Sequence, residues 1–170
     1  GAPLLYKEHI EKMFADSFNK LLKNKDEIIN NWREFVKSID DTQMLETEKA
    51  RLCGESRLLY EKIQNYIDKN ATETLNQNIY KKHYNTLSNE YEEIKQKIEN
   101  IDTKLKNKRA KLLSIEKFLN EISERENLID TFDEKLFTSV VDKIIVKSYT
   151  KVAIIFRNGQ ELSLNLEEYK

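Results

Sequence analysis

One apolar seam constrains this chain more than any other feature of its sequence. Between Tyr80 and Ile122, apolar residues recur at alternating steps of four and three, and only Lys108 interrupts the series. A 3.5-residue period sustained for about six heptads is typical of a coiled coil and exceeds what a globular helix needs. The seam consists of Tyr80, Tyr84, Leu87, Tyr91, Ile94, Ile98, Ile101, Leu105, Leu112, Ile115, Leu119 and Ile122. Since one helix cannot shield this stripe from water, another helix must lie alongside it.

The preceding segment predicts that partner helix. Leu45, Leu52, Leu59 and Tyr66 recur at sevenfold spacing, which predicts a helix over residues 42–69. Its alternate seam positions are mostly polar, and Gly54 costs about 1 kcal/mol of helix stability relative to alanine. We therefore expect the partner to be the weaker helix of the pair.

Residues 70–76 predict a turn between the two helices. Asn70 can adopt a left-handed C-terminal cap, and Asn76 can cap the helix that follows, over residues 77–124. Residues 40–127 are thus expected to form an antiparallel coiled-coil arm with its tip at 70–76.

The N-terminal segment predicts one base helix over residues 7–39, with a wide apolar face. The seam from Leu105 to Ile122 is expected to pair with the second half of this helix. Asp41 or Thr42 can cap the next helix. We interpret Asp40–Asp41 as a hinge, and a tight reversal that produces a three-helix bundle remains the alternative.

The C-terminal residues 128–170 change character. Asp133 can cap a short helix over 134–143, and strands are expected at 144–149, 152–156 and 161–166, with a turn at Asn158-Gly159. The sheet is expected to rest on the short helix and on the start of the base helix. The predicted fold class is mainly α: a long antiparallel intramolecular coiled coil with a small C-terminal helix and an antiparallel hairpin or sheet of two or three strands.

Composition limits the function classes. The chain has 170 residues, of which 35% are charged, and its net charge of −1 gives no reason for strong non-specific binding to nucleic acid. One cysteine, Cys53, excludes an internal disulfide framework, and His9 and His83 are too few to complete a zinc site with it. We interpret Cys53 as a small apolar filler.

No apolar run of membrane-spanning length and no signal peptide is visible in the sequence, so the expected setting is the cytoplasm, without membrane contact. The start at Gly1-Ala2-Pro3 is interpreted as a cloning remnant or internal cut, with residues 1–6 as a linker. The chain is accordingly expected to be a fragment of a longer protein.

Three C-terminal segments carry a resemblance to a known family. They read FDEKLF (132–137), VVDKIIV (140–146) and IFRNGQEL (155–162), and the segment from Phe14 to Ile28 adds to them. Together with the tip helix at Tyr80, Tyr84 and Leu87, they resemble the C-terminal region of large serine recombinases, which include phage integrases and transposon-excising enzymes. The resemblance covers nearly the whole chain, and the 132–162 block is its most specific part.

The resemblance implies a fold and a function. In that family a catalytic serine domain precedes a recombinase domain and a zinc-ribbon domain, which bind attachment-site DNA, and a coiled coil is inserted in the zinc-ribbon domain. Its tip contacts other subunits during synapsis, and a directionality factor acts through this region. By resemblance this chain is the coiled coil and the end of the zinc-ribbon domain, with zinc held elsewhere in the parent. No catalytic, cofactor-binding or metal-ligating residue is assigned here, so the fragment itself is expected not to be an enzyme.

Two groups of residues are candidates for binding. Apolar and aromatic residues near the tip, where two helices offer little core, are candidates for contact with another subunit: Tyr66, Ile67, Leu75 and Ile79. The alternative is that the tyrosines simply fill the seam. A basic cluster near the base of the arm is a candidate for phosphate contact: Lys104, Lys106, Arg109 and Lys111. The alternative for the basic cluster is that it forms an ordinary solvated helix face. The alternative for the whole chain is that it is a structural coiled-coil spacer between two domains of an unrelated protein.

Overall fold

The computed structural model describes residues 5–169 and divides into two compact units. The base unit comprises the chain up to Ile39 together with the chain from Lys111 onward, and the arm unit is Asp40–Ala110. The arm unit is therefore an insertion between two parts of the base unit. Residues 1–4 of the expected linker lie outside the described residues.

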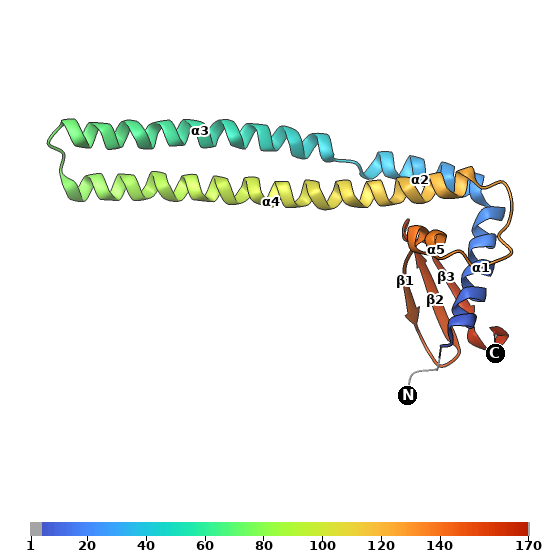
Figure 1. Cartoon of the computed structure of the whole chain (residues 1–170). Coiled ribbons are helices and arrows are strands. Elements are labelled where there is room, and N and C mark those ends of the chain that lie inside the picture. Colours follow the sequence, from blue (N-terminus) through green and yellow to red (C-terminus); the bar gives the residue numbers. More distant parts are fainter. Residues whose placement is uncertain (1–4, 170) are drawn as a thin grey trace. The chain divides into compact units, whose positions relative to one another are not determined.

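The arm unit is a hairpin of two helices, α3 (Thr42–Thr72) and the first part of α4 (Gln77–Glu124) (Figure 1). The predicted bounds of α4 are confirmed, whereas α3 continues three residues beyond its predicted end. Asn70 is not a left-handed cap, because no described residue other than Gly159 has a positive φ. The helix ends at Thr72, and the next residue, Glu73, is its C-cap. Glu73 has an extended backbone but still donates its N–H to the Lys69 carbonyl at 2.9 Å.

The turn at the tip is correspondingly shorter than predicted and occupies residues 73–76. The cap at Asn76 is confirmed, since its side-chain Oδ1 accepts the N–H groups of Asn78 at 3.0 Å and Ile79 at 3.2 Å. These bonds satisfy backbone donors that the first turn of α4 would otherwise leave unpaired.

The predicted seam of α4 faces inward along its whole length, and none of its positions is exposed. In the arm unit, Leu52 of α3 is buried with Ile101 and Leu105 of α4, and other seam residues cover the edges of this cluster. Lys108, the interruption of the seam, forms an ion pair with Asp41 at 2.5 Å. The antiparallel intramolecular coiled coil is thus confirmed.

Asp40 and Asp41 separate α3 from the preceding helix. The N-cap residue is Asp41, one of the two predicted, and its carbonyl accepts the Leu45 N–H at 3.1 Å. The side-chain hydrogen bonds come from its neighbour Asp40, whose carboxylate accepts the Thr42 hydroxyl at 2.6 Å and the Thr42 N–H at 3.1 Å. These two hydrogen bonds hold the pKa of Asp40 below its usual value. The Asp41 side chain makes no such bond and pairs with Lys108 instead.

The base helix predicted over 7–39 is two helices, α1 (Lys7–Lys23) and α2 (Lys25–Ile39). The prediction was wrong at Asn24, which leaves the helical region at φ −114° and ψ 20° and donates its N–H to Leu21. The next residue, Lys25, donates its ammonium to the Arg125 carbonyl at 2.6 Å, just beyond the C-terminus of α4. Ile29 of α2 shares a core with Ile115, Leu119 and Ile122, so the predicted pairing is confirmed for this part of the seam. It is wrong for Leu105, which packs with Leu52 of α3 in the arm unit instead.

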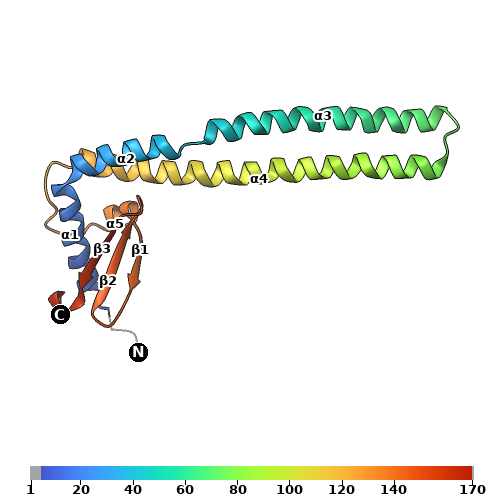
Figure 2. The same cartoon turned by 180° about the vertical axis from the view of Figure 1, so that it is seen from behind.

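The C-terminal residues form α5 (Glu134–Val140) and three antiparallel strands in the order β1 (Val141–Val146), β2 (Lys151–Phe156) and β3 (Glu161–Asn165), followed by a 3₁₀ turn at Leu166–Tyr169 (Figure 2). The Asp133 cap is confirmed by bonds to the N–H groups of Lys135 and Leu136. Gly159, with φ 89°, provides the left-handed residue of the predicted turn.

The helix expected over 134–143 ends three residues early. The Val140 carbonyl accepts the Arg157 N–H at 2.9 Å, and Val141 pairs with Phe156 of β2. Residues 141–143, which the periodicity predicted as helix, therefore belong to strand β1. The register shifts between Val141 and Lys143, which makes Asp142 the extra residue of a β-bulge.

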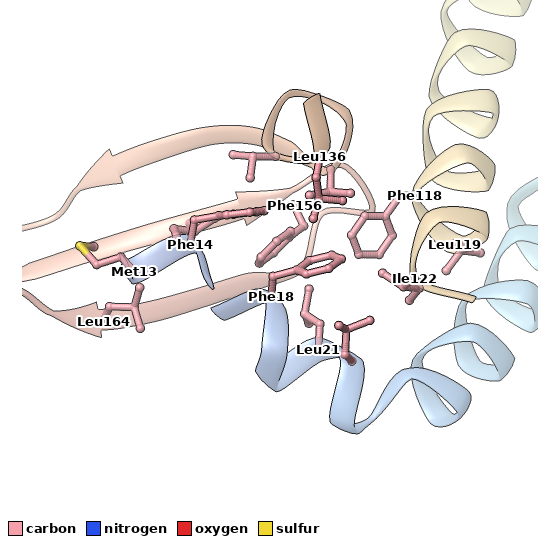
Figure 3. Packing of buried hydrophobic residues seen from close by; sticks show 14 of the residues in the cluster. Met13, Phe14, Phe18, Leu21, Phe118, Leu119, Ile122, Leu136, Phe156 and Leu164 are labelled. Atoms are coloured by element: carbon pink, nitrogen blue, oxygen red, sulfur yellow. The ribbon is translucent and has the colours of Figure 1, made fainter. Parts of the chain in front are cut away.

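The core of the base unit joins the sheet to four helices, α1, α2, α4 and α5. Phe14 and Phe18 of α1, Phe118 of α4 and Phe156 of β2 are all fully buried (Figure 3). Asn19 connects this layer to the loop after α4: its amide exchanges two hydrogen bonds with the backbone of Ile129, at 2.8 and 2.9 Å. These contacts confirm that the sheet rests on α5 and on the start of the N-terminal helix.

Candidate functional site

The tyrosines near the tip form a stack across the two helices of the arm. The ring of Tyr66 lies 5.1 Å from that of Tyr80, nearly parallel to it, and Tyr80 lies 6.0 Å from Tyr84. His83 contacts the edge of Tyr66. All three tyrosines are half-buried seam residues. Tyr66, predicted as a contact residue, therefore has its ring engaged within the hairpin.

The other three predicted contact residues differ in exposure. Ile67 and Leu75 are half-buried, whereas Ile79 is 58% exposed. The turn beside them is held in place because the Gln77 side chain donates to Asn70 at 3.0 Å and to the Leu75 carbonyl at 3.2 Å. Ile79 thus presents an apolar side chain from an ordered helix start.

An exposed isoleucine is not by itself a binding site, because most folded proteins expose some apolar side chains. Leu58 and Met44 on α3 are also exposed, at 55% and 75%. What sets Ile79 apart is its place next to the turn, close in sequence to Leu75. Leu58 offers the matched comparison: an equally exposed aliphatic residue in the middle of a helix.

The predicted basic cluster divides between the two units. In the arm unit Arg109 is ion-paired with Glu46, whereas Lys104 and Lys106 are exposed and no carboxylate among residues 5–169 lies within 4 Å of either ammonium. Lys111 belongs to the base unit. Lys111 is likewise exposed and has no carboxylate within 4 Å among residues 5–169. Three of the four predicted lysine and arginine side chains, namely Lys104, Lys106 and Lys111, are therefore solvated and available to contact a phosphate.

Cys53 is exposed, which corrects its interpretation as an apolar filler. It follows the seam residue Leu52, and so it lies off the buried stripe of α3. Within residues 5–169 no group of three or more histidine, cysteine or carboxylate side chains is placed to hold a metal ion. None of the helices in that range combines the length and apolarity that crossing a bilayer requires.

The base unit contains a cavity that the sequence did not predict. It has a volume of about 440 Å³ and is lined by Trp32, Lys111, Ser114, Asp142, Phe156, Arg157, Asn158 and Gly159. These residues come from α2, α4, the bulge of β1 and the turn between β2 and β3. Asn158-Gly159 signalled a turn in the sequence, but no periodicity indicates that distant helices place Trp32 and Lys111 beside it.

One polar atom of the lining residue Asn158 is buried and unusual. Asn158 is 3% exposed, and its side-chain nitrogen Nδ2 has no hydrogen-bond partner, although its Oδ1 accepts the Gln160 N–H at 3.0 Å. Leaving a buried donor unpaired costs about 1–3 kcal/mol. Such an atom calls for an explanation in a native structure.

No protein-family model matches this chain, and no curated protein or solved structure is significantly similar to it. The resemblance to large serine recombinases therefore rests on the sequence segments that carry it.

Proposed function

We propose that this chain is the coiled-coil region, with the end of the zinc-ribbon domain, of a large serine site-specific DNA recombinase. Its role is contact between recombinase subunits during synapsis and control of the direction of recombination. One observation carries the proposal: a two-helix antiparallel arm, residues 40–110, is inserted into a small unit of helices and a three-stranded sheet. The family's coiled coil is likewise an insertion in a small domain.

The internal packing of the arm supports the tip as the functional part. Every seam position of α3 and α4 in the arm is turned inward, so the seam serves the hairpin itself. The ordered turn and the exposed Ile79 leave an apolar contact on the outside of the tip. In this proposal the partners are other subunits at the tip, attachment-site DNA and zinc through the rest of the parent, and a directionality factor, in the cytoplasm.

The test is a pair of matched substitutions in the full-length parent. Ile79→Glu places a charge at the tip, and Leu58→Glu places the same charge at an equally exposed position on α3. We expect Ile79→Glu to abolish the complex of two DNA sites while binding to a single site is retained, as measured by gel mobility shift. Leu58→Glu is expected to retain both. The double variant Ile67→Glu, Leu75→Glu is expected to behave like Ile79→Glu.

Two results would contradict the proposal. If Ile79→Glu lost single-site binding but kept pairing of bound sites, the tip would not be a subunit contact. If all variants paired sites normally, the arm would act as a spacer between domains, which is the competing function. Circular dichroism of each variant fragment checks that the helices are retained.

A further inference from the structure

We propose that the cavity in the base unit binds a small oxyanion, such as free phosphate or the phosphate of a mononucleotide. This site is independent of the arm and of the function proposed for its tip. Its volume of about 440 Å³ lies within the roughly 300–1,000 Å³ typical of small-molecule sites. All of its lining residues belong to one compact unit, so the cavity is formed within that unit alone.

The wall of the cavity has an excess of hydrogen-bond donors. Within residues 5–169, no carboxylate lies within 4 Å of the Lys111 ammonium, although other lysines of the chain form ion pairs. Arg157 directs Nε and Nη2 to the Thr138 carbonyl, at 3.3 and 2.9 Å, and so keeps further N–H donors. The hydroxyl of Ser114 adds one more. A ligand rich in acceptor oxygens would satisfy these groups.

Asn158 is the most specific of the donors. The bond from the Gln160 N–H to Oδ1 fixes the orientation of its amide, and the opposite end, Nδ2, is left without a partner while the side chain is buried. A phosphate oxygen held by Lys111 and Arg157 would supply the missing acceptor after a small shift of the turn. Gly159 next to it has no atom within 4 Å of the position of a Cβ, so this side of the turn borders open space.

Asp142 is the one carboxylate of the lining, and the β-bulge of β1 places it there. Its negative charge repels an anion, so the direction in which the affinity changes when a charge is removed can be tested. Removing the Asp142 charge should strengthen binding, whereas removing the Lys111 charge should weaken it. A cationic ligand would show the reverse order, and an apolar ligand would respond little to either change.

The cavity favours a small anion over a nucleic acid. A half-open pocket lined by eight residues offers no extended track for a nucleic-acid backbone. The chain as a whole has a net charge of −1, which does not attract a polyanion. A duplex is nonetheless a necessary comparison, because it carries the same phosphate chemistry.

Trp32 provides the measurement, since it is the only tryptophan of the chain and lines the cavity. Titration with inorganic phosphate and with adenosine monophosphate, followed by Trp32 emission, should give saturable changes. Lys111→Gln and Asn158→Asp should each weaken binding about tenfold, as expected for loss of a charge-assisted hydrogen bond. Asn158→Asp keeps the oxygen that accepts the Gln160 N–H and replaces the unpaired donor by an acceptor. Asp142→Asn should tighten binding.

Lys117→Gln is the matched control, an exposed lysine on the same helix outside the lining. Its affinity should equal that of the wild type. A stronger response to phosphate than to the mononucleotide would identify free phosphate as the ligand, and the opposite order a phosphorylated nucleoside.

The proposal is overturned if neither probe changes the emission at millimolar concentration, or if Lys117→Gln weakens binding as much as Lys111→Gln. It is also overturned if a short DNA duplex changes the emission at lower concentration than either small probe. Thermal unfolding by circular dichroism shows whether Asn158→Asp folds. If it does not, the opposite effects expected of Lys111→Gln and Asp142→Asn still decide the matter.

Discussion

The base unit and the arm unit use the same helix α4 in different ways. Beyond residue 111, α4 packs against both α2 and the sheet, and its residues Phe118 and Ile122 are completely buried. In the arm, α4 packs against α3, and its most buried residues there are Leu105 and Ile101, at 4% and 9% exposure. In the arm, the two helices shield only the one apolar seam between them. In the base unit, helices and the sheet surround the buried side chains from several directions.

The arm compensates with polar contacts between its helices. Lys49 pairs with Asp102 at 2.6 Å, and the hydrogen bond that its ammonium donates to the Asp102 carboxylate raises the pKa of Lys49. Arg109 pairs with Glu46, and Lys108 with Asp41. Since exposed pairs contribute about 0–1 kcal/mol each, they set the register of the helices more than they stabilise them. Because its residues are less completely buried, we expect the arm unit to unfold locally more readily than the base unit.

The largest effect is expected in the base core. Phe118→Ala removes a fully buried ring that contacts Phe156, with centroids 5.9 Å apart. It should lower the free energy of unfolding by about 3–5 kcal/mol, as for other buried aromatic truncations. Denaturant unfolding followed by Trp32 emission measures this. A loss below about 1 kcal/mol, typical of surface positions, would show that the base core is not tightly packed.

A smaller effect is expected in the arm. Leu52→Ala removes the buried centre of the α3–α4 cluster, and about 2–3 kcal/mol should be lost because the thin hairpin can relax around the gap. Hydrogen exchange should accelerate along α3 and the first part of α4, with exchange in the β-strands unchanged. Leu58→Ala, at an exposed position of the same helix, is the control and should change little. Equal acceleration in the strands would show that the two units unfold together.

A gain of stability is expected at Gly54. It lies inside α3 with nothing within 4 Å of the position of a Cβ, so Gly54→Ala adds helix propensity without a clash. The gain should be about 0.5–1 kcal/mol and confined to the arm. Slower amide exchange in α3 alone would confirm this, whereas unchanged exchange would mean that Gly54 does not weaken the hairpin.

The smallest effect is expected in the base unit at alkaline pH. Burial, and secondarily the hydrogen bond that Tyr169 donates to Asp16 at 2.8 Å, raise the pKa of Tyr169. Its contribution to stability is present below about pH 10, the unfolded value, and is lost as the pH rises through the higher folded value. The unfolding midpoint of the wild type should therefore fall more steeply above about pH 10 than that of Tyr169→Phe. Parallel curves would contradict this.

The sequence predicted what depends on periodicity and local capping. The seam of α4, its bounds, the Asn76 and Asp133 caps and the Asn158-Gly159 turn are all confirmed, because each rests on residues close together in the chain. The positions at which helices end were predicted less well. Asn24 ends α1 although the apolar pattern runs through it, and the strand ladder takes Val141 away from the predicted helix.

Long-range contacts explain the remaining differences. Phe118 lies outside the seam, and its burial follows from the sheet, which no helical period encodes. The cavity beside Asn158 likewise depends on four elements that only the fold brings together. At the tip, the sequence identified the candidates, and the structure separates the stacked Tyr66 from the exposed Ile79.

Native-state hydrogen exchange of the unmodified chain tests the central claim most directly, namely that a weakly buried arm is inserted in a well-packed base. We expect amides of α3 and of α4 before residue 110 to exchange through openings of lower free energy than amides of β2 and of α4 around Phe118. A single common opening free energy across α3, α4 and β2 would contradict it.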